Sequence, residues 1–327
     1  MAPRRGFTRV LIGAIVAAVA VLLGGIWLGG HPGDLPSPLR SHFFDNRPSE
    51  SVLVQALGVL STRYYRPIDR SRVIDDALAG MVAGLDDRYS RYIEPSAQRA
   101  TADDSGAEAP AEIPVVTSTI LTVRDVHIGY VRLRTFSDGS GDEVRAEVEN
   151  VMHAHARALI LDLRENGGGL ISQAIDITSL FLHHGTIMSA VERGQPRRVY
   201  SAHGDAIAPR IPMAVLVDRG TASAAEIVAA ALQEHGRATI VGTRTYGKGV
   251  FQLTLPLSND GALDITIGQF FTPNGHNLGG GGDPAEAGIA PNVIAGGEPG
   301  APADEALTAA ERTVAAEVDR ARAPARG

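Results

Sequence analysis

Three short stretches of the sequence carry side chains suited to nucleophilic and acid–base chemistry. The first holds Ser223, which follows the apolar run Met213 to Val217 and precedes an alanine-rich segment. The hydroxyl is therefore predicted to lie where a buried strand turns into a helix, beside unpaired backbone N–H groups that favour developing negative charge. Serine is also a common N-cap, a purely structural role. Ser223 alone leaves both roles open.

The second stretch is a run of three glycines, Gly167 to Gly169, directly after the apolar strand predicted at Ala158 to Leu163. Glycine has no side chain to keep a ligand away, so backbone N–H groups can approach an oxyanion closely. A tight turn between a strand and a helix would use the same residues. The run indicates either an oxyanion-binding loop or an ordinary turn.

The third stretch places Lys248 between Gly247 and Gly249. Glycine neighbours add no bulk, so the lysine can be drawn into a site, where only its neutral form acts as a base. The alternative is a solvated loop lysine. The stretch is not a phosphate-binding loop, because glycine rather than serine or threonine follows the lysine.

Alternating strands and helices are predicted to position these three stretches. Apolar and β-branched runs predict strands at 128–133, 158–163, 186–191 and 213–217. Helical spacing predicts helices over 144–155, after Ile171 and after Ser223. This alternation is typical of an α/β domain.

The N-terminus predicts export and membrane anchoring. Arg4, Arg5 and Arg9 precede residues 10–30, which contain no charged side chain. About 20 apolar residues are enough to cross the hydrocarbon core, and the arginines should stay cytoplasmic. We therefore expect a single-pass protein of the cell membrane whose body is periplasmic or extracellular. A cleaved signal peptide is the alternative, and it would release the same body as a secreted protein.

Composition predicts seven segments along the chain. They are a basic cytoplasmic tail (1–9), a transmembrane signal anchor in the lipid bilayer (10–30), a proline-containing spacer (31–48), a helical segment (49–99), a flexible linker (100–113), the α/β core (114–293) and a C-terminal tail (294–327). Within the tail, residues 304–322 are expected to form a capped surface helix.

Composition also excludes several kinds of function. The chain has no cysteine, which excludes disulfides, zinc–thiolate sites and a cysteine nucleophile, and its net charge of -7 gives no reason to expect nucleic acid. No cofactor or metal is expected. A Ser–His hydrolase stays an alternative because histidines are numerous, although no Gly-x-Ser-x-Gly elbow is present; they include His153, His155, His183, His184, His203, His235 and His276.

The three stretches together resemble the C-terminal processing peptidases, also called tail-specific proteases. The matching blocks are Leu-Asp-Leu-Arg-x-Asn-x-Gly-Gly-Leu at 161–170, Thr-Ala-Ser-Ala-x-Glu-Ile at 221–227, Thr-Tyr-Gly-Lys-Gly-x-x-Gln at 245–252 and Thr-Pro-Asn-Gly at 272–275. The run Gly84 to Tyr92 is similar to the N-terminal region of that family. The resemblance covers most of the chain, from this run to the stretch that begins at Gly288.

The resemblance implies a serine endopeptidase that acts on polypeptides through an acyl-enzyme. Ser223 would be the nucleophile, Lys248 the general base and Gln252 the residue that orients the lysine. The backbone N–H groups of Gly168 and Ala224 would form the oxyanion hole. The implied fold is a spiral of ββα units related to crotonases and Clp-type proteases. A contact between Lys248 and Gln252 needs a helical turn after Gly247, because an extended strand would separate them by roughly 13 Å.

The sequence departs from the family in three places. Only residues 95–127 occupy the interval where most members carry a PDZ domain, so we expect that domain to be absent and an adapter to be a possible replacement. Gly167 stands where a proline is usual, and the loop Gly279 to Ala287 looks expanded. A catalytically silent adapter or pseudoenzyme with the same core is the remaining alternative. The natural substrate and the oligomeric state are open.

Overall fold

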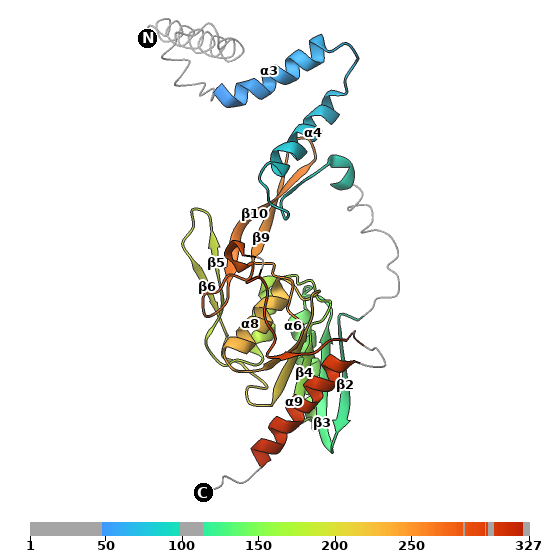
Figure 1. Ribbon diagram of the computed structural model, residues 1–327, viewed down its shortest axis with the longest axis vertical. Coiled ribbons are helices and arrows are strands. Elements are labelled where there is room, and N and C mark those ends of the chain that lie inside the picture. Colours follow the sequence, from blue (N-terminus) through green and yellow to red (C-terminus); the bar gives the residue numbers. More distant parts are fainter. Residues whose placement is uncertain (1–47, 99–113, 284, 298, 300–303, 323–327) are drawn as a thin grey trace, which may run out of the picture. The chain divides into compact units, whose positions relative to one another are not determined.

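The computed structural model describes residues 48–98, 114–283, 285–297, 299 and 304–322 (Figure 1). The chain divides into two units, with the boundary between Gly80 and Met81. The predicted basic tail, membrane anchor, nearly all of the spacer and the linker at 100–113 lie outside the described residues. Within the described ranges, no helix combines the length and the apolar composition that crossing a membrane requires.

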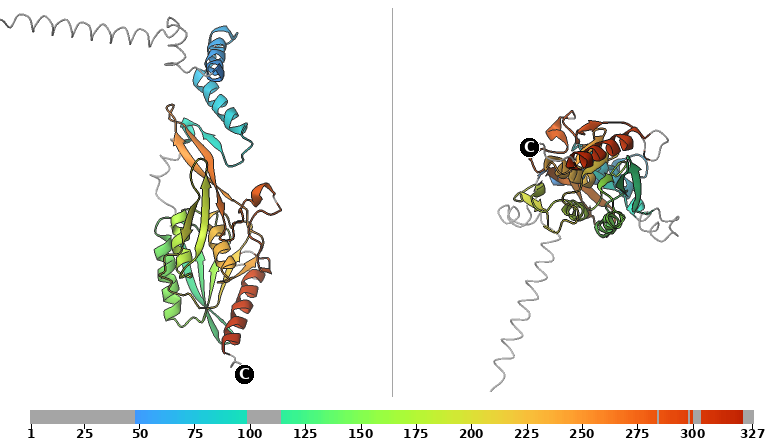
Figure 2. Two further views of the ribbon diagram at one scale, coloured as in Figure 1. Left: turned by 90° about the vertical axis from the view of Figure 1, so that its left-hand side faces the viewer. Right: turned by 90° about the horizontal axis from the view of Figure 1, so that it is seen from below.

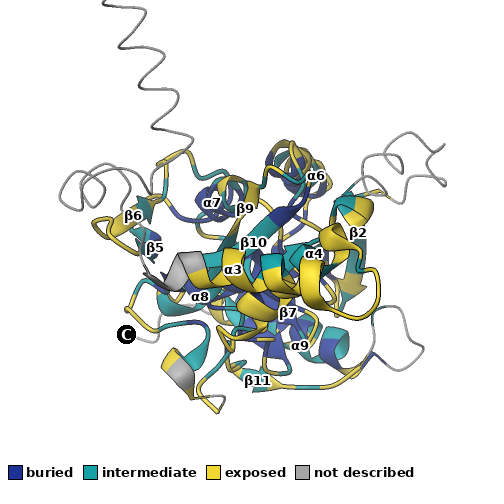
Figure 3. Cartoon of the chain, turned by 90° about the horizontal axis from the view of Figure 1, so that it is seen from above, coloured by how far each residue is buried: buried dark blue, intermediate teal, exposed yellow. Residues whose placement is uncertain are grey.

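The first unit contains the two helices expected from the apolar spacing. They are α3 (Pro48–Arg63) and α4 (Arg70–Ala83), the second of which ends just past the boundary between the units. Several large apolar side chains of α3 are exposed, including Val52, Leu53 and Leu60, and α3 is coloured as exposed along much of its length in Figure 3.

A six-stranded sheet forms the centre of the second unit. Its order is β11 (Val293–Ile294), β8 (Thr239–Gly242), β7 (Met213–Val217), β4 (Ala158–Asp162), β3 (Val126–Leu133) and β2 (Val116–Val123). Neighbouring strands are parallel except for β2, which pairs with β3 in an antiparallel hairpin. Every residue of β4 and β7 is buried, as expected for the central strands of a covered sheet.

Helices cover both faces of this sheet. One face packs against α6 (Ser140–His153), α7 (Ile171–Ser179) and α8 (Ala224–Glu234), and the other packs against α9 (Glu305–Arg322), as the left view of Figure 2 shows. Leu159 and Leu161 point to the first face, whereas Ala158 and Ile160 point to the second, because successive side chains of a strand alternate. This is a mixed α/β fold, as predicted.

The C-terminal helix occupies a different place from the one predicted. The sequence suggested a capped surface helix in a tail, but Ala306, Ala310, Val314 and Val318 are buried against the sheet. These residues recur every four positions, but two of the four are alanines, so the sequence did not identify them as a buried face. α9 is a layer of the core, and Asp304 caps it by accepting a 2.9 Å hydrogen bond from the N–H of Leu307.

A second, antiparallel sheet carries the lysine stretch. Its order is β1 (Arg91–Ile93), β10 (Ala262–Phe271), β5 (Thr186–Glu192) and β6 (Arg198–Ser201), and β9 (Val250–Pro256) also pairs with β10. The run before β1 was assigned to the helical segment 49–99. Here β1 pairs with β10, so residues 84–98 belong to the second unit.

Candidate active site

Ser223 lies at the sharp turn between β7 and α8. Its backbone angles are φ 55° and ψ -117°, a conformation that non-glycine residues rarely adopt. The preceding loop is fixed to the loop after β4, because Ala222 N–H donates to the Asn166 carbonyl (2.9 Å) and the Thr221 hydroxyl donates to the Leu163 carbonyl (2.8 Å). A strained turn of this kind presents a serine hydroxyl at the start of a helix, and Ser223 is only half-buried.

The glycine loop lies directly against this turn. A Cβ on Gly168 would lie 2.8 Å from both the Ala222 carbonyl oxygen and Ser223 Cβ, and the φ of Gly168 is 101°. Gly169, with a φ of 140°, passes so close to Phe136 that a side chain would overlap its carbonyl group. Glycine is required at both positions, and the loop brings the backbone of Gly168 next to Ser223 and Ala224.

One of the two predicted oxyanion donors is already hydrogen-bonded. The N–H of Gly168 donates to Asn166 Oδ1 at 2.9 Å, and Asn166 Nδ2 donates to the Leu133 carbonyl at 2.9 Å. Asn166 is fully buried. By contrast, no hydrogen bond from the N–H of Ala224 is found among the described residues. Of the two predicted donors, the N–H of Gly168 therefore has a partner within the protein.

Glu226 connects the serine turn to the lysine stretch. Its Oε2 accepts hydrogen bonds from the backbone N–H groups of Ser223 and Lys248, both at 2.9 Å. Its Oε1 accepts from the N–H of Gly247 at 2.7 Å and from the Thr245 hydroxyl. The backbone nitrogens of Ser223 and Lys248 therefore lie within two hydrogen-bond lengths of each other.

The sequence interpretation did not assign a role to Glu226, although it quoted the residue within a matching block. Ser-x-x-Glu at the start of a helix is the capping-box pattern, and that was the available signal. The side chain is fully buried, and burial raises the pKa of its carboxyl against the opposing effect of the hydrogen bonds.

The glycines on either side of Lys248 permit close packing rather than free movement. Gly247 has a φ of 86°, and a Cβ there would lie 2.7 Å from the Ala287 side chain. A side chain at Gly249 would overlap the backbone of Gly279. Gly279 and Ala287, the two ends of the loop predicted to be expanded, thus pack against the lysine stretch, and together with Glu226 they fix the main chain of Lys248.

The turn predicted after Gly247 is wrong. From Val250 the chain forms β9 and pairs with β10, and Gln252 stands opposite Thr266. The Gln252 amide donates to the Thr266 hydroxyl at 3.2 Å. The long-range ladder outweighs the local turn, and no hydrogen bond joins Gln252 to Lys248 among the described residues.

An aromatic ring from outside the predicted site faces the lysine. Lys248 Nζ lies 5.6 Å from the centre of the Tyr89 ring. The guanidinium of Arg88 lies 4.7 Å from the same ring and 5.3 Å from the ring of Tyr246. The resemblance marked this run as similar to the family but gave it no role at the site.

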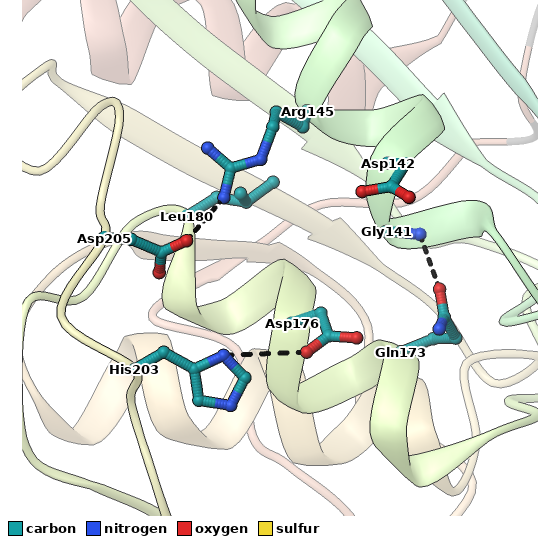
Figure 4. Close-up of a pocket in the computed structure, with 8 residues that line it drawn as sticks. All are labelled: Gly141, Asp142, Arg145, Gln173, Asp176, Leu180, His203 and Asp205. Atoms are coloured by element: carbon teal, nitrogen blue, oxygen red, sulfur yellow. Dashed lines mark hydrogen bonds and ion pairs between the residues drawn. The ribbon is translucent and has the colours of Figure 1, made fainter.

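His203 lies in a pocket that is separate from the predicted site. A polar pocket of about 280 Å³ contains a His203–Asp176 pair at 3.7 Å and an Arg145–Asp205 pair at 2.7 Å (Figure 4). No predicted site residue lines this pocket. In the parts of the chain that the structure describes, no histidine is hydrogen-bonded to Ser223, and no cluster of His, Asp and Glu has a metal-binding arrangement.

Comparison with protein families places this site in a known context. The model of peptidase family S41 matches residues 127–295, which include all five predicted site residues. The chain is 34% identical over 226 residues to a carboxyl-terminal-processing protease of Synechocystis sp., covering 65% of this chain and 52% of that protein. It is 37% identical over 201 residues to a carboxy-terminal-processing protease of Bartonella bacilliformis, covering 58% and 44%. The chain thus spans about half the length of these curated relatives.

Solved structures show the same fold. A photosystem II D1 C-terminal processing protease superposes with a TM-score of 0.60 at 24% identity, covering 75% of this chain and 87% of that one. A putative peptidase from Parabacteroides merdae superposes with a TM-score of 0.56 at 18% identity, covering 83% and 98%.

Proposed function

Because the chain belongs to peptidase family S41, we propose that it is a serine endopeptidase that cleaves polypeptides with Ser223 and Lys248. One observation carries this proposal. The buried carboxylate of Glu226 accepts hydrogen bonds from the backbone N–H groups of both Ser223 and Lys248. A nucleophile and a base need side chains within hydrogen-bond reach of one another, and the shared acceptor keeps the backbone nitrogens of Ser223 and Lys248 within two hydrogen-bond lengths.

The proposed reaction proceeds in two halves. Neutral Lys248 accepts the proton of the Ser223 hydroxyl as the oxygen attacks the scissile carbonyl carbon, and the protonated lysine then gives that proton to the departing amine. This leaves an ester on Ser223. Lys248 then takes a proton from water as the water oxygen attacks the ester, and it returns that proton to the Ser223 oxygen as the acyl–oxygen bond breaks, which releases the carboxylic acid product and restores both residues.

The oxyanion of each tetrahedral intermediate would be held by the N–H groups of Ala224 and Gly168. Gly168 now donates to Asn166, so a substrate oxygen must compete with that amide for its N–H. The assigned role of Gln252 likewise requires a rearrangement at the start of β9, because its side chain bonds Thr266 here.

A small cavity that is lined in part by apolar side chains supports a preference for small apolar side chains near the scissile bond. It has a volume of about 70 Å³, and polar and charged side chains, which include Glu192, Gln195 and Arg198, line it together with Ile171, Ala190, Phe251 and Phe270. Ile171 follows the glycine loop by two residues, and Phe251 follows Lys248 by three. We place the substrate side chain there.

The test is cleavage of an unstructured protein such as casein by the purified full-length chain. We expect activity that rises with pH, and a fall of at least about 1,000-fold in both Ser223→Ala and Lys248→Ala. Mass spectrometry of the fragments should find mainly apolar residues beside the cleaved bonds.

Unchanged cleavage by Lys248→Ala would contradict the dyad, and a bell-shaped dependence of activity on pH, centred near the pKa of histidine, would favour the Ser–His alternative. A folded wild-type chain without any cleavage would favour the silent adapter.

The location of the enzyme is a further part of the proposal. The arginines before residues 10–30 support an anchor in the cell membrane with residues 31–327 on the extracytoplasmic side. A reporter fused to the C-terminus should be active only outside the cytoplasm and should sediment with membranes. Recovery in the soluble extracytoplasmic fraction would instead indicate cleavage of the N-terminal segment.

The domain boundaries follow the same reasoning. We propose that residues 114–293, together with the strand β1 and the helix α9, form the peptidase core as a spiral of ββα units. The short interval at 95–127 supports a core that works without a PDZ domain, so recognition of C-terminal tails is not part of the proposed function.

A further inference from the structure

Tyr89 sits in a turn that is fastened to the sheet carrying the lysine. Its N–H donates to Asp87 Oδ1 at 3.0 Å, and the Ser90 hydroxyl donates to Asp87 Oδ2 at 2.6 Å. Ser90 Oγ in turn accepts the N–H of Thr266 at 3.0 Å. The turn is therefore anchored to the backbone of β10 rather than left as a free loop.

The two strands that follow Tyr89 and Lys248 run in the same direction. β1 begins two residues after Tyr89, β9 begins two residues after Lys248, and both strands pair antiparallel with β10 on its opposite edges. The two residues thus approach one region of the sheet from either side of β10. Segments that are about 160 residues apart in sequence meet there.

The main chain of Lys248 is held in place, so the position of its ammonium group depends on the side chain alone. Its main chain is held by Glu226 on one side, and on the other Gly249 is packed against Gly279 and its carbonyl accepts the N–H of Phe270 at 2.8 Å. Within the described ranges, no carboxylate forms an ion pair with the ammonium group, and the Tyr89 ring is the group found facing it.

An aromatic face is a suitable partner for a lysine that has to give up its proton. The ring attracts the ammonium and keeps the side chain from swinging into solvent. A carboxylate would do the same, but it would also hold the proton strongly. The ring also favours the charged lysine, but less strongly than a carboxylate would, so it orders the side chain with a smaller cost to its role as a base.

We propose that Tyr89 is a positioning residue of the peptidase, which restrains the side chain of Lys248 at the site through the face of its ring. This inference rests on the proposed Ser–Lys function. Arg88 supports the ring, because it donates a hydrogen bond to the Tyr89 hydroxyl and lies over the Tyr246 ring as well. The run before β1 therefore supplies a part of the active site.

The test compares Tyr89→Phe with Tyr89→Leu in the full chain. Tyr89→Phe keeps the ring and should retain kcat within about 3-fold, whereas Tyr89→Leu keeps apolar bulk without a π face and should lower kcat about 10-fold or more, with KM changed less than about 3-fold. The rate at which a fluorophosphonate labels Ser223 should fall in proportion to kcat, since it reports activation of the serine without a peptide substrate.

Tyr65→Leu is the matched control. The guanidinium of Arg66 lies 4.8 Å from the centre of the Tyr65 ring, so this ring also faces a cation. Tyr65 belongs to the first unit, whereas Tyr89 belongs to the second. The kcat of Tyr65→Leu should equal that of wild type. Should Tyr89→Leu fail to fold, Tyr89→Gln supplies a second non-aromatic side chain, and the same fall is expected.

Two outcomes would overturn the inference. Wild-type or higher kcat in Tyr89→Leu would mean that the ring does not help the lysine, and equal losses in Tyr89→Phe and Tyr89→Leu would mean that the ring face is not what matters. If Lys248→Ala abolishes cleavage while Tyr89→Leu does not lower it, the positioning role fails and the dyad stands. If Lys248→Ala stays active, the proposed function itself fails.

Discussion

At the scale of single residues, Glu226 does the most to define the site. Four donors converge on its two oxygens, and three of them are backbone N–H groups of Ser223, Gly247 and Lys248. A side chain that only accepts hydrogen bonds is required there, and an ionised carboxylate is the one that meets all four. The turn at Ser223 and the lysine stretch come from different strands, and this side chain joins them together with a backbone hydrogen bond from the N–H of Tyr246 to the Thr221 carbonyl at 3.0 Å.

We therefore predict that Glu226→Gln lowers kcat/KM at least about 10-fold and destabilises the fold by about 1–3 kcal/mol. The amide NH₂ of glutamine would face backbone N–H groups, and it cannot accept hydrogen bonds from them. Casein cleavage and urea unfolding measure the two effects. Glu234→Gln is the control, because Glu234 lies at the other end of the same helix, where it accepts the N–H of Asn274 at 2.7 Å and faces His276 Nδ1 at 3.4 Å.

The pH dependence of this variant gives an independent check. Burial raises the pKa of Glu226, so in the window above the ordinary glutamate value the folded protein holds a proton that the unfolded chain has lost. The stability contributed by this group is full below that window and is lost as pH rises through the folded-state pKa. Activity should rise with pH over the same window, because only the ionised carboxylate accepts all four hydrogen bonds. Both trends should be absent in Glu226→Gln, and their persistence would contradict the role given to this carboxyl.

At the scale of elements, glycine conformation decides how the loops reach the serine. Gly167 and Gly168 are adjacent but differ in their surroundings. Gly167 has no atom within 4 Å of an added Cβ, whereas an added Cβ on Gly168 would collide with the backbone of Ala222. Gly168 also has a φ of 101°.

Gly168→Ala should accordingly abolish casein cleavage, since the loop would have to move away from Ser223. Gly167→Ala should keep at least half of the activity and leave the melting temperature unchanged or slightly higher, because a restricted unfolded chain adds about 0.4–1 kcal/mol at a compatible site. Comparing cleavage with thermal unfolding separates loss of the site from loss of the fold. Equal activity in the two variants would argue against an oxyanion role for Gly168.

The elements themselves were largely predictable from sequence, and the contacts between them were not. Apolar periodicity identified α6, β4 and β7, because a buried strand or an amphipathic helix imprints its period on the chain. The prediction of a turn after Gly247 was wrong because the conformation there depends on distant packing. Gly247 packs against Ala287 and Gly249 packs against Gly279, both of which are far away in sequence. The candidate nucleophile and base came from a resemblance, whereas Glu226 and Tyr89 gained roles only once β1, β9 and α8 were placed together.

At the scale of the whole second unit, a buried arginine joins the site to the C-terminal layer. Arg164 is 1% exposed and lies between two carboxylates, with Asp162 at 2.6 Å and Asp304 at 2.8 Å. Asp162 ends β4, directly before the loop that leads to Gly168, and Asp304 caps α9. One guanidinium therefore connects the central strand to the helix that covers the opposite face of the sheet.

Replacing this arginine should loosen the C-terminal layer of the unit. Arg164→Met leaves two buried carboxylates without their cation, a change that costs about 3–5 kcal/mol when a buried pair is broken. Arg145→Met provides the comparison, because its partner Asp205 is 55% exposed and a surface pair contributes only about 0–1 kcal/mol. Hydrogen exchange should show faster opening of α9 in Arg164→Met, together with a markedly lower melting temperature. If both variants lost the same stability, the buried arginine would not be what holds α9 to the sheet.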